Sequence, residues 1–263
     1  GAKWTSVEFV DDALAHGAQL LTETEVTAVV RDNGRAVGVT THPVGRPSAL
    51  TEMRADRVIL AAGALETPRI LQRSGLHEAG THLALDAFVS TFGFTDDVGM
   101  QGEHILGSYL ESALEEKDLF SAPYMYVPFY LQLYKDYRPG DGPMKASMAD
   151  QATLLLKSKR LPAKHALGMM SKIRDEMSGQ VRLDGTIEKR MTVSDQAKLE
   201  EAKVLHRELL VAAGVRQETI FDGPVEAGHP CCTAGIGRVV DEHQQTEIAG
   251  LYELAVPGSG TVL

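Results

Sequence analysis

The chain has 263 residues and a formal net charge of −10, from 26 basic and 36 acidic side chains. This acidic balance disfavours nucleic acid or an anionic membrane surface as the main partner. The length is sufficient for one large domain or two smaller ones, each with a substantial core. No apolar run of about 18 residues occurs and the N-terminus has no leader-like pattern, so we expect no membrane span.

The only two cysteines, Cys231 and Cys232, are adjacent in the sequence. Neighbouring cysteines rarely pair with each other, because the ring that they would close is strained, and we therefore expect no disulfide framework. A reducing compartment is then favoured, and the expected location is the cytoplasm. Adjacent cysteines also suit tetrahedral zinc poorly, so we expect no metal site.

In chain order, residues 5–17 carry an apolar face that predicts a helix, and residues 18–21 read as a short strand. Residues 25–30 and 36–41 read as two strands joined at Asp32-Asn33-Gly34, whose composition is typical of a hairpin turn. A further strand is expected up to residue 61. Its last part, Val-Ile-Leu at residues 58–60, has the length and composition of a strand buried on both faces.

A run of small residues, Ala-Ala-Gly at positions 61–63, follows this strand. It leaves bare backbone against which a flat or charged ligand could lie. Thr67 before Pro68 suits an N-cap and the first position of a helix that ends at Gly75. A strand, a glycine turn and a helix N-terminus in this order can hold an anion or a dinucleotide. The alternative is an ordinary strand-to-helix junction.

The middle of the chain has weaker patterns. Residues 88–94 predict a strand, and residues 108–119 predict a helix or a loop. Residues 121–137 are rich in tyrosine and follow Phe120, and such a cluster could line a pocket for an apolar alcohol or a sugar ring, or simply form part of the core.

Further along, residues 152–170, with His165 near their end, include a second expected helix. In residues 180–193 apolar and polar side chains alternate, as in a strand with one buried face. Ser194 is expected to cap a long helix that ends at Gly214, and His206 within it is expected to be a surface or packing residue.

Two segments resemble signatures of one family. Residues 63–75, with a Thr-Pro pair and a Ser-Gly pair, are similar to the second signature of the glucose-methanol-choline (GMC) oxidoreductases, which are FAD-dependent alcohol oxidases and dehydrogenases. Residues 228–237 (GHPCCTAGIG), then Val-Val-Asp at 239–241 and Gly-Leu-Tyr at 250–252, resemble a later part of these proteins. The two segments lie in the same order along the chain as in the family, and the length of chain between them suits a substrate domain.

The resemblance implies an α/β (α+β) fold with two parts. Residues 1–75 and 226–263 would form a partial FAD-binding, Rossmann-like portion. Residues 76–225 would form a substrate-binding domain, built on a mostly antiparallel sheet with helices packed against it.

The resemblance also implies an activity, in which a flavoprotein oxidises the CH–OH group of an alcohol, sugar or sterol and hydride passes to FAD. His229 is the expected acid/base, because a neutral imidazole near pH 7 can take the hydroxyl proton. A histidine before a proline could instead be a turn residue. The expected partners are the small alcohol substrate and an electron acceptor, either oxygen or another molecule.

Six residues are expected to bind the cofactor. Val26 would contact the adenine through its backbone, although it could be only a strand residue. The full set is Val26, Ala62, Gly63, Pro230, Gly258 and Ser259.

The chain departs from the family at its N-terminal end, because the Gly-x-Gly-x-x-Gly motif that opens GMC proteins is absent. We therefore expect either one part of a larger protein, whose missing FAD-binding half a second chain could carry, or a degraded relative that cannot hold FAD by itself. The alternative function is a non-catalytic subunit or fragment that retains the shape of the substrate domain.

Overall fold

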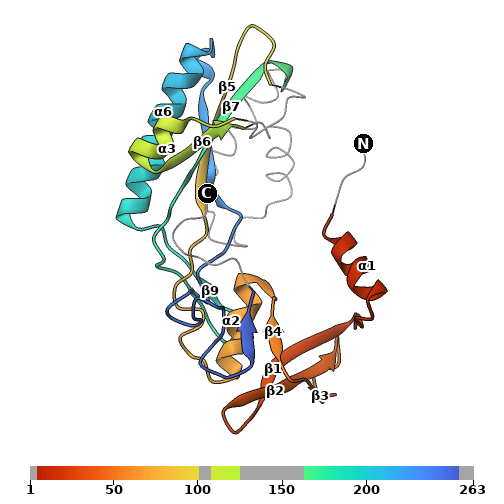
Figure 1. Ribbon diagram of the computed structural model, residues 1–263. Coiled ribbons are helices and arrows are strands. Elements are labelled where there is room, and N and C mark those ends of the chain that lie inside the picture. The colour runs from red at the N-terminus through yellow and green to blue at the C-terminus, as the bar shows by residue number, and fades with distance from the viewer. Residues whose placement is uncertain (1–4, 101–107, 125–162, 255–263) are drawn as a thin grey trace.

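The computed structural model describes residues 5–100, 108–124 and 163–254. One of the sheets has four strands. Figure 1 shows it with its helices at one end of the molecule, and the remaining strands around α2 (Gly63–Arg73) at the other. The architecture is a mixture of helices and mostly antiparallel sheet, as predicted. In these three ranges, no helix combines the length and the hydropathy needed to cross a bilayer.

The first helix, α1 (Val7–Ala15), confirms the predicted helix but buries none of its residues. Figure 1 shows it apart from the rest of the described chain. The strand predicted over residues 18–21 is wrong, since this segment is an exposed connection that pairs with no described strand. Its leucines, Leu20 and Leu21, are 58% and 52% exposed, so the apolar pattern here does not mark a core.

Strands β1 (Thr24–Asp32), β2 (Arg35–Pro43) and β3 (Thr51–Arg54) form an antiparallel sheet in that order. The predicted hairpin is confirmed. Asn33 and Gly34 have φ of 48° and 79°, which matches the right-handed twist of the flanking strands and explains the Asn-Gly pair.

Strand β4 (Val58–Leu60) pairs in parallel with β11 (Leu251–Glu253) at the other end of the chain. Val58 and Leu60 pack in a core beneath α2 (Gly63–Arg73), whereas Ile59 is 57% exposed. The prediction of a strand buried on both faces is therefore wrong, because the described chain covers only one face of β4.

The helix start expected at Thr67 and Pro68 is also wrong. Helix α2 begins at Gly63 after the N-cap residue Ala62, and it contains Pro68 in its interior. Thr67 is buried, and its hydroxyl accepts a hydrogen bond from the Ala62 amide at 3.1 Å. Thr67 thus stabilises the preceding turn from within the helix.

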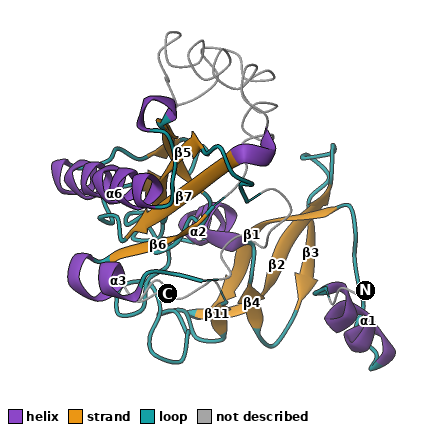
Figure 2. Cartoon of the chain, turned by 90° about the horizontal axis from the view of Figure 1, so that it is seen from above, coloured by secondary structure: helices purple, strands orange, loops and turns teal. Residues whose placement is uncertain are grey.

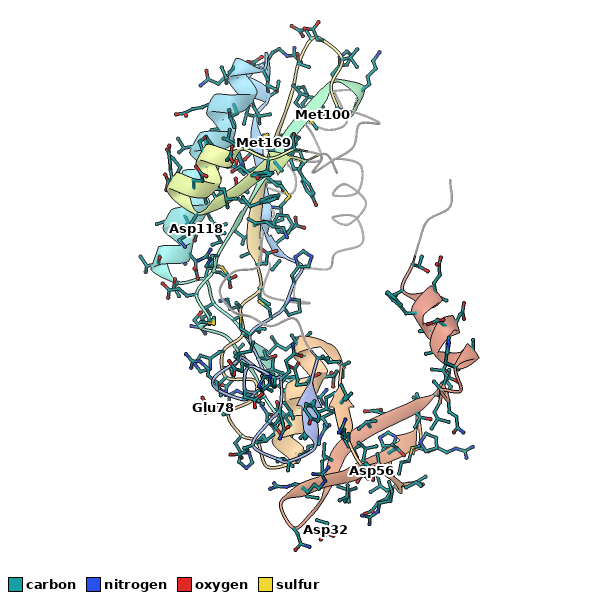
Figure 3. All side chains as sticks on the ribbon, in the orientation of Figure 1. Asp32, Asp56, Glu78, Met100, Asp118 and Met169 are labelled. Atoms are coloured by element: carbon teal, nitrogen blue, oxygen red, sulfur yellow. The ribbon has the colours of Figure 1, made fainter. Side chains whose placement is uncertain are left out.

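The large sheet is antiparallel throughout. Its order is β10 (Phe221–Ala227), β5 (Ala87–Phe94), β7 (Ala166–Ile173) and β6 (Leu119–Pro123). The strand predicted over residues 88–94 is confirmed as β5. The helix predicted to end at residue 170 is not, because Met169 and its neighbours form β7 between β5 and β6 (Figure 3).

Two helices cover one face of this sheet (Figure 2). They are α3 (Glu111–Lys117), which confirms a helix within residues 108–119, and the long α6 (Val193–Ala212). The cap predicted at Ser194 is wrong, since Thr192 caps α6 and forms a reciprocal capping box with Asp195.

The remaining elements are short. Residues 180–193 contain two strands, β8 (Gln180–Val181) and β9 (Ile187–Glu188), which pair antiparallel as a small hairpin. Single 3₁₀ turns occur at Ala163–His165 and Gln217–Thr219.

Candidate active site

The two segments that carry the family resemblance meet in the structure. The hydroxyl of Thr233, which is 2% exposed, donates a hydrogen bond to the carbonyl oxygen of Ala64 in the first turn of α2, at 2.8 Å. The carbonyl oxygen of Thr233 accepts from the amide of Gly80 at 2.7 Å. The segment after His229 is thereby held against the β4–α2 junction.

The proline inside α2 explains this contact. Pro68 has no N–H, so it cannot donate the helical hydrogen bond to the carbonyl four residues earlier, which is that of Ala64. The Thr233 hydroxyl supplies the missing donor from 169 positions away in the chain. The Thr-Pro pair of the first segment and the threonine of the second therefore form one structural unit.

We expect Thr233→Val to lower the free energy of unfolding by about 1–3 kcal/mol, because it leaves the Ala64 carbonyl without its donor. Urea titration measures this loss. In a Pro68→Ala background the helix can supply its own N–H, so the same substitution should cost clearly less. Equal costs in both backgrounds would show that the proline and the threonine are not coupled.

His229 contacts one acidic and one basic side chain. Its Nδ1 is 2.7 Å from Asp86 Oδ2 and 2.9 Å from Lys172 Nζ. Lys172 and Asp86 also form an ion pair with each other. The His229 side chain is 69% exposed, and in the part of the chain that the structure describes its Nε2 contacts no polar group.

Two groups compete for Nδ1 of His229. The Asp86 carboxylate, at 2.7 Å, accepts a proton carried on Nδ1, whereas the Lys172 ammonium, at 2.9 Å, can only donate and needs the Nδ1 lone pair. In the tautomer that carries its proton on Nδ1, the hydrogen bond goes to Asp86 and Nε2 is left as a base that faces outward. The ion pair with Lys172 balances the charge of Asp86, so the imidazole is held by a locally neutral pair.

A buried carboxylate, Asp175, supports this cluster from behind. It accepts hydrogen bonds from the amides of Leu85 at 3.1 Å, Asp86 at 2.8 Å and Ala87 at 3.4 Å. It also pairs with buried Lys189 at 2.6 Å. These bonds hold Asp86 at a left-handed φ of 56°, a conformation that the turn before β5 requires in order to aim its side chain at His229.

The sheet contributes an aromatic surface beside the cluster. Ser171 contacts His206 of α6, so its neighbour Lys172 lies on the opposite face of the sheet. Lys172 pairs across the sheet with Phe88 on β5 and with Phe120 on β6. The Phe88 ring meets the Tyr124 ring edge-on at a centroid distance of 6.0 Å.

Of the aromatic cluster predicted at residues 121–137, Tyr124 therefore lies on the same face as Lys172, as does Phe120 just before it. Residues 125–137 lie outside the described ranges.

The β4–α2 junction has the features that a dinucleotide needs. Ala62 and Gly63 are exposed at the carboxyl end of a parallel strand and at the N-terminus of α2. Gly63 has a φ of +75°, and a Cβ placed on it would meet no atom within 4 Å. The residues present thus fit a flat group lying against open backbone.

The other predicted cofactor residues are placed as follows. Val26 packs against the core beneath α2, and Pro230 is half-buried next to His229. Gly258 and Ser259 lie outside the described residues. The contact that joins the two segments is the one between Thr233 and Ala64, next to Gly63.

Sequence patterns did not single out Asp86, Lys172 or Asp175. Lys172 lies just after residues 152–170, whose end was expected to be helical, so its face could not be assigned. The alternation of small and large residues in the segment Ala166–Ile173 was the available signal for a strand.

Comparisons with solved structures identify the fold. The chain is similar to an FAD-dependent oxidoreductase from Chaetomium thermophilum, with a TM-score of 0.60, 16% identity and coverage of 96% of this chain and 60% of that one. Pyridoxine 4-oxidase from Mesorbium loti gives a TM-score of 0.54 at 16% identity, over 89% of this chain and 52% of that one. The chain therefore has the fold of flavin-dependent oxidoreductases.

Sequence comparison matches the N-terminal part of the chain to one family. Residues 1–99 match the GMC oxidoreductase family. An uncharacterised GMC-type oxidoreductase from Mycobacterium tuberculosis is 36% identical over 110 residues, which are 40% of this chain and 17% of that protein. The matched residues include the motif at residues 63–75 from which the resemblance to this family was predicted. The chain spans about half to three fifths of the solved structures and less of the mycobacterial relative. FAD, the cofactor predicted from the motifs, is also the cofactor of the Chaetomium enzyme.

Proposed function

We propose that this chain is part of an FAD-dependent alcohol oxidase or dehydrogenase that oxidises a CH–OH group, with His229 as the acid/base. The observation that carries the proposal is the position of His229. Its Nδ1 is fixed by Asp86, its Nε2 faces outward, and the segment that bears it is bonded to the first turn of α2. A base held in this way can take the proton of a hydroxyl group at Nε2.

FAD, when bound, would accept the hydride from the substrate carbon. The exposed backbone of Ala62 and Gly63 and the N-terminus of α2 would hold part of it. Val26, Pro230, Gly258 and Ser259 are proposed as its further contacts from the family resemblance. The task of the chain is to place the hydroxyl between this cradle and His229.

The proposed substrate is a small alcohol, sugar or sterol whose carbon skeleton lies on the aromatic surface formed by Phe88, Phe120 and Tyr124. Lys172 is already neutralised by Asp86, so this surface does not select for an anion. Oxygen or another acceptor would then reoxidise the flavin. A reducing location such as the cytoplasm is consistent with both cysteines being thiols.

We further propose that the missing flavin-binding strands come from another part of a longer protein or from a second chain. Ile59 on β4 is 57% exposed, and α1 presents Val7 and Phe9 at 59% and 67% exposure. Apolar side chains exposed on a two-stranded sheet and on an outlying helix are typical of surfaces that other segments cover.

Absorbance spectroscopy and intact mass of the natively purified protein test this proposal together. We expect flavin bands, a mass larger than that of this chain or a second chain, and bleaching of the flavin by an alcohol without oxygen. A colourless protein with only this chain's mass would favour the alternative, a non-catalytic relative. Flavin that no alcohol, sugar or sterol reduces would contradict the proposed reaction while leaving cofactor binding intact.

A further inference from the structure

Two thiols lie next to the candidate catalytic histidine and take no part in the chemistry proposed for it. The Sγ atoms of Cys231 and Cys232 are 3.5 Å apart, and both residues are half-buried thiols. The pair sits between two anchors of the backbone. The Cys231 amide donates to the carbonyl of Ala84 at 2.9 Å, and Thr233 is bonded to α2.

We propose that Cys231 and Cys232 are a redox-active dithiol that a peroxide oxidises to a disulfide between adjacent residues. The inference rests on the distance between the sulfurs, on their partial exposure and on the backbone between them. Cys232 has a left-handed φ of 71°, so the two side chains turn toward each other across a single peptide. The proposed oxidation of the thiols is independent of the proposed alcohol oxidation, since any hydroperoxide or hydrogen peroxide can serve as oxidant.

The electrostatic surroundings assign different roles to the two thiols. When Cys232 ionises, the Cys231 thiol donates a hydrogen bond to it, which lowers the pKa of Cys232 and raises that of Cys231. The ammonium group of Lys189 lowers the pKa of Cys232 further, whereas burial and Asp175 oppose this. Cys232 is therefore the attacking thiolate and Cys231 the thiol that resolves the product.

The reaction balances with one peroxide. The Cys232 thiolate attacks a peroxide oxygen, an S–O bond forms, the O–O bond breaks and, after protonation, water or an alcohol leaves. The Cys231 sulfur then attacks Cys232 Sγ, a disulfide forms and the hydroxyl group leaves as water with the Cys231 proton. Two thiols are oxidised and one peroxide is reduced.

The disulfide between adjacent residues is strained, and it is therefore easily reduced to the two thiols. Adjacent Cα atoms across a trans peptide are about 3.8 Å apart, below the roughly 4.4 Å at which disulfides usually begin. Strained disulfides are readily reduced, which is a property of regulatory rather than structural bridges. Because His229 and Thr233 flank the pair, closure of the ring must change the backbone between the fixed imidazole and α2.

Intact mass spectrometry of the protein before and after stoichiometric hydrogen peroxide tests the proposal. We expect the loss of two hydrogen atoms, the disappearance of both iodoacetamide-reactive thiols of this chain, and full recovery after dithiothreitol. Cys231→Ser should instead give a sulfenic acid on Cys232 that dimedone traps, and Cys232→Ser should react clearly more slowly.

Three results would overturn the proposal. They are a wild-type protein that keeps both thiols under these conditions, one that goes directly to irreversible sulfinic acid, and one that forms a disulfide-linked dimer on a non-reducing gel. Because the readout is mass, it does not depend on whether the protein oxidises alcohols.

Discussion

His229→Gln is expected to slow the reduction of bound flavin by an alcohol about 10²–10⁴-fold, the usual contribution of a positioned acid/base. Glutamine retains polarity and approximate size but cannot take a proton at the position of Nε2. The substrate should still bind, because the aromatic surface of Phe88 and Phe120 is unchanged. Stopped-flow absorbance of the complete protein under anaerobic conditions measures the rate of flavin reduction directly.

His243→Gln is the matched control, since the His243 side chain is 81% exposed and, among the residues that the structure describes, pairs with its neighbour Glu242 alone. It should leave the reduction rate unchanged. The rate of flavin reduction in Asp86→Asn should lie between the rates in His229→Gln and His243→Gln. The asparagine amide can still contact Nδ1 of His229, but it no longer requires a proton on that nitrogen. A His229→Gln protein that reduces its flavin at the wild-type rate would exclude His229 as the acid/base.

The parts of the fold that were predictable are those fixed by local chemistry. The Asn33-Gly34 turn demands positive φ at both positions, and the strands on either side follow from it. The small residues around Gly63 likewise indicated open backbone before a helix, which the structure has. His229 was identified by the family motif, and no local rule would have distinguished it from a turn residue.

The errors arise where a distant residue decides the local structure. Pro68 normally marks the start of a helix, and it is tolerated inside α2 because Thr233 satisfies the carbonyl of Ala64. Met169 lies in a strand because β5 and β6 flank it on both sides. Lys172 and Asp86 meet His229 through sheet pairing and the buried carboxylate of Asp175, and neither interaction has a sequence signature.

The free energy of unfolding is expected to fall by about 3 kcal/mol between pH 6.5 and pH 4 through His206 alone. This side chain is fully buried, with Nδ1 3.0 Å from the Thr91 hydroxyl and Nε2 2.7 Å from the Ser171 hydroxyl. Burial, and secondly the charge of Arg207, lowers the pKa of His206 from 6.5 to about 4. The unfolded chain therefore binds this proton at a higher pH than the folded one, so the contribution is complete above pH 6.5 and is lost as the pH falls toward 4.

Urea titrations of the wild-type protein and of His206→Gln at several pH values separate the contribution of His206 to stability from that of the carboxylates, because the carboxylates titrate in both proteins. The wild type should lose clearly more stability than the variant across this window, and His16→Gln, whose side chain is 77% exposed, should follow the wild type. If His206→Gln is too unstable to titrate, the NMR shift of the His206 ring in the wild type provides the same answer. Protonation of that ring in the folded protein near pH 6.5 would show that the hydrogen bonds from the sheet to α6 stabilise the charged imidazole, which contradicts the prediction.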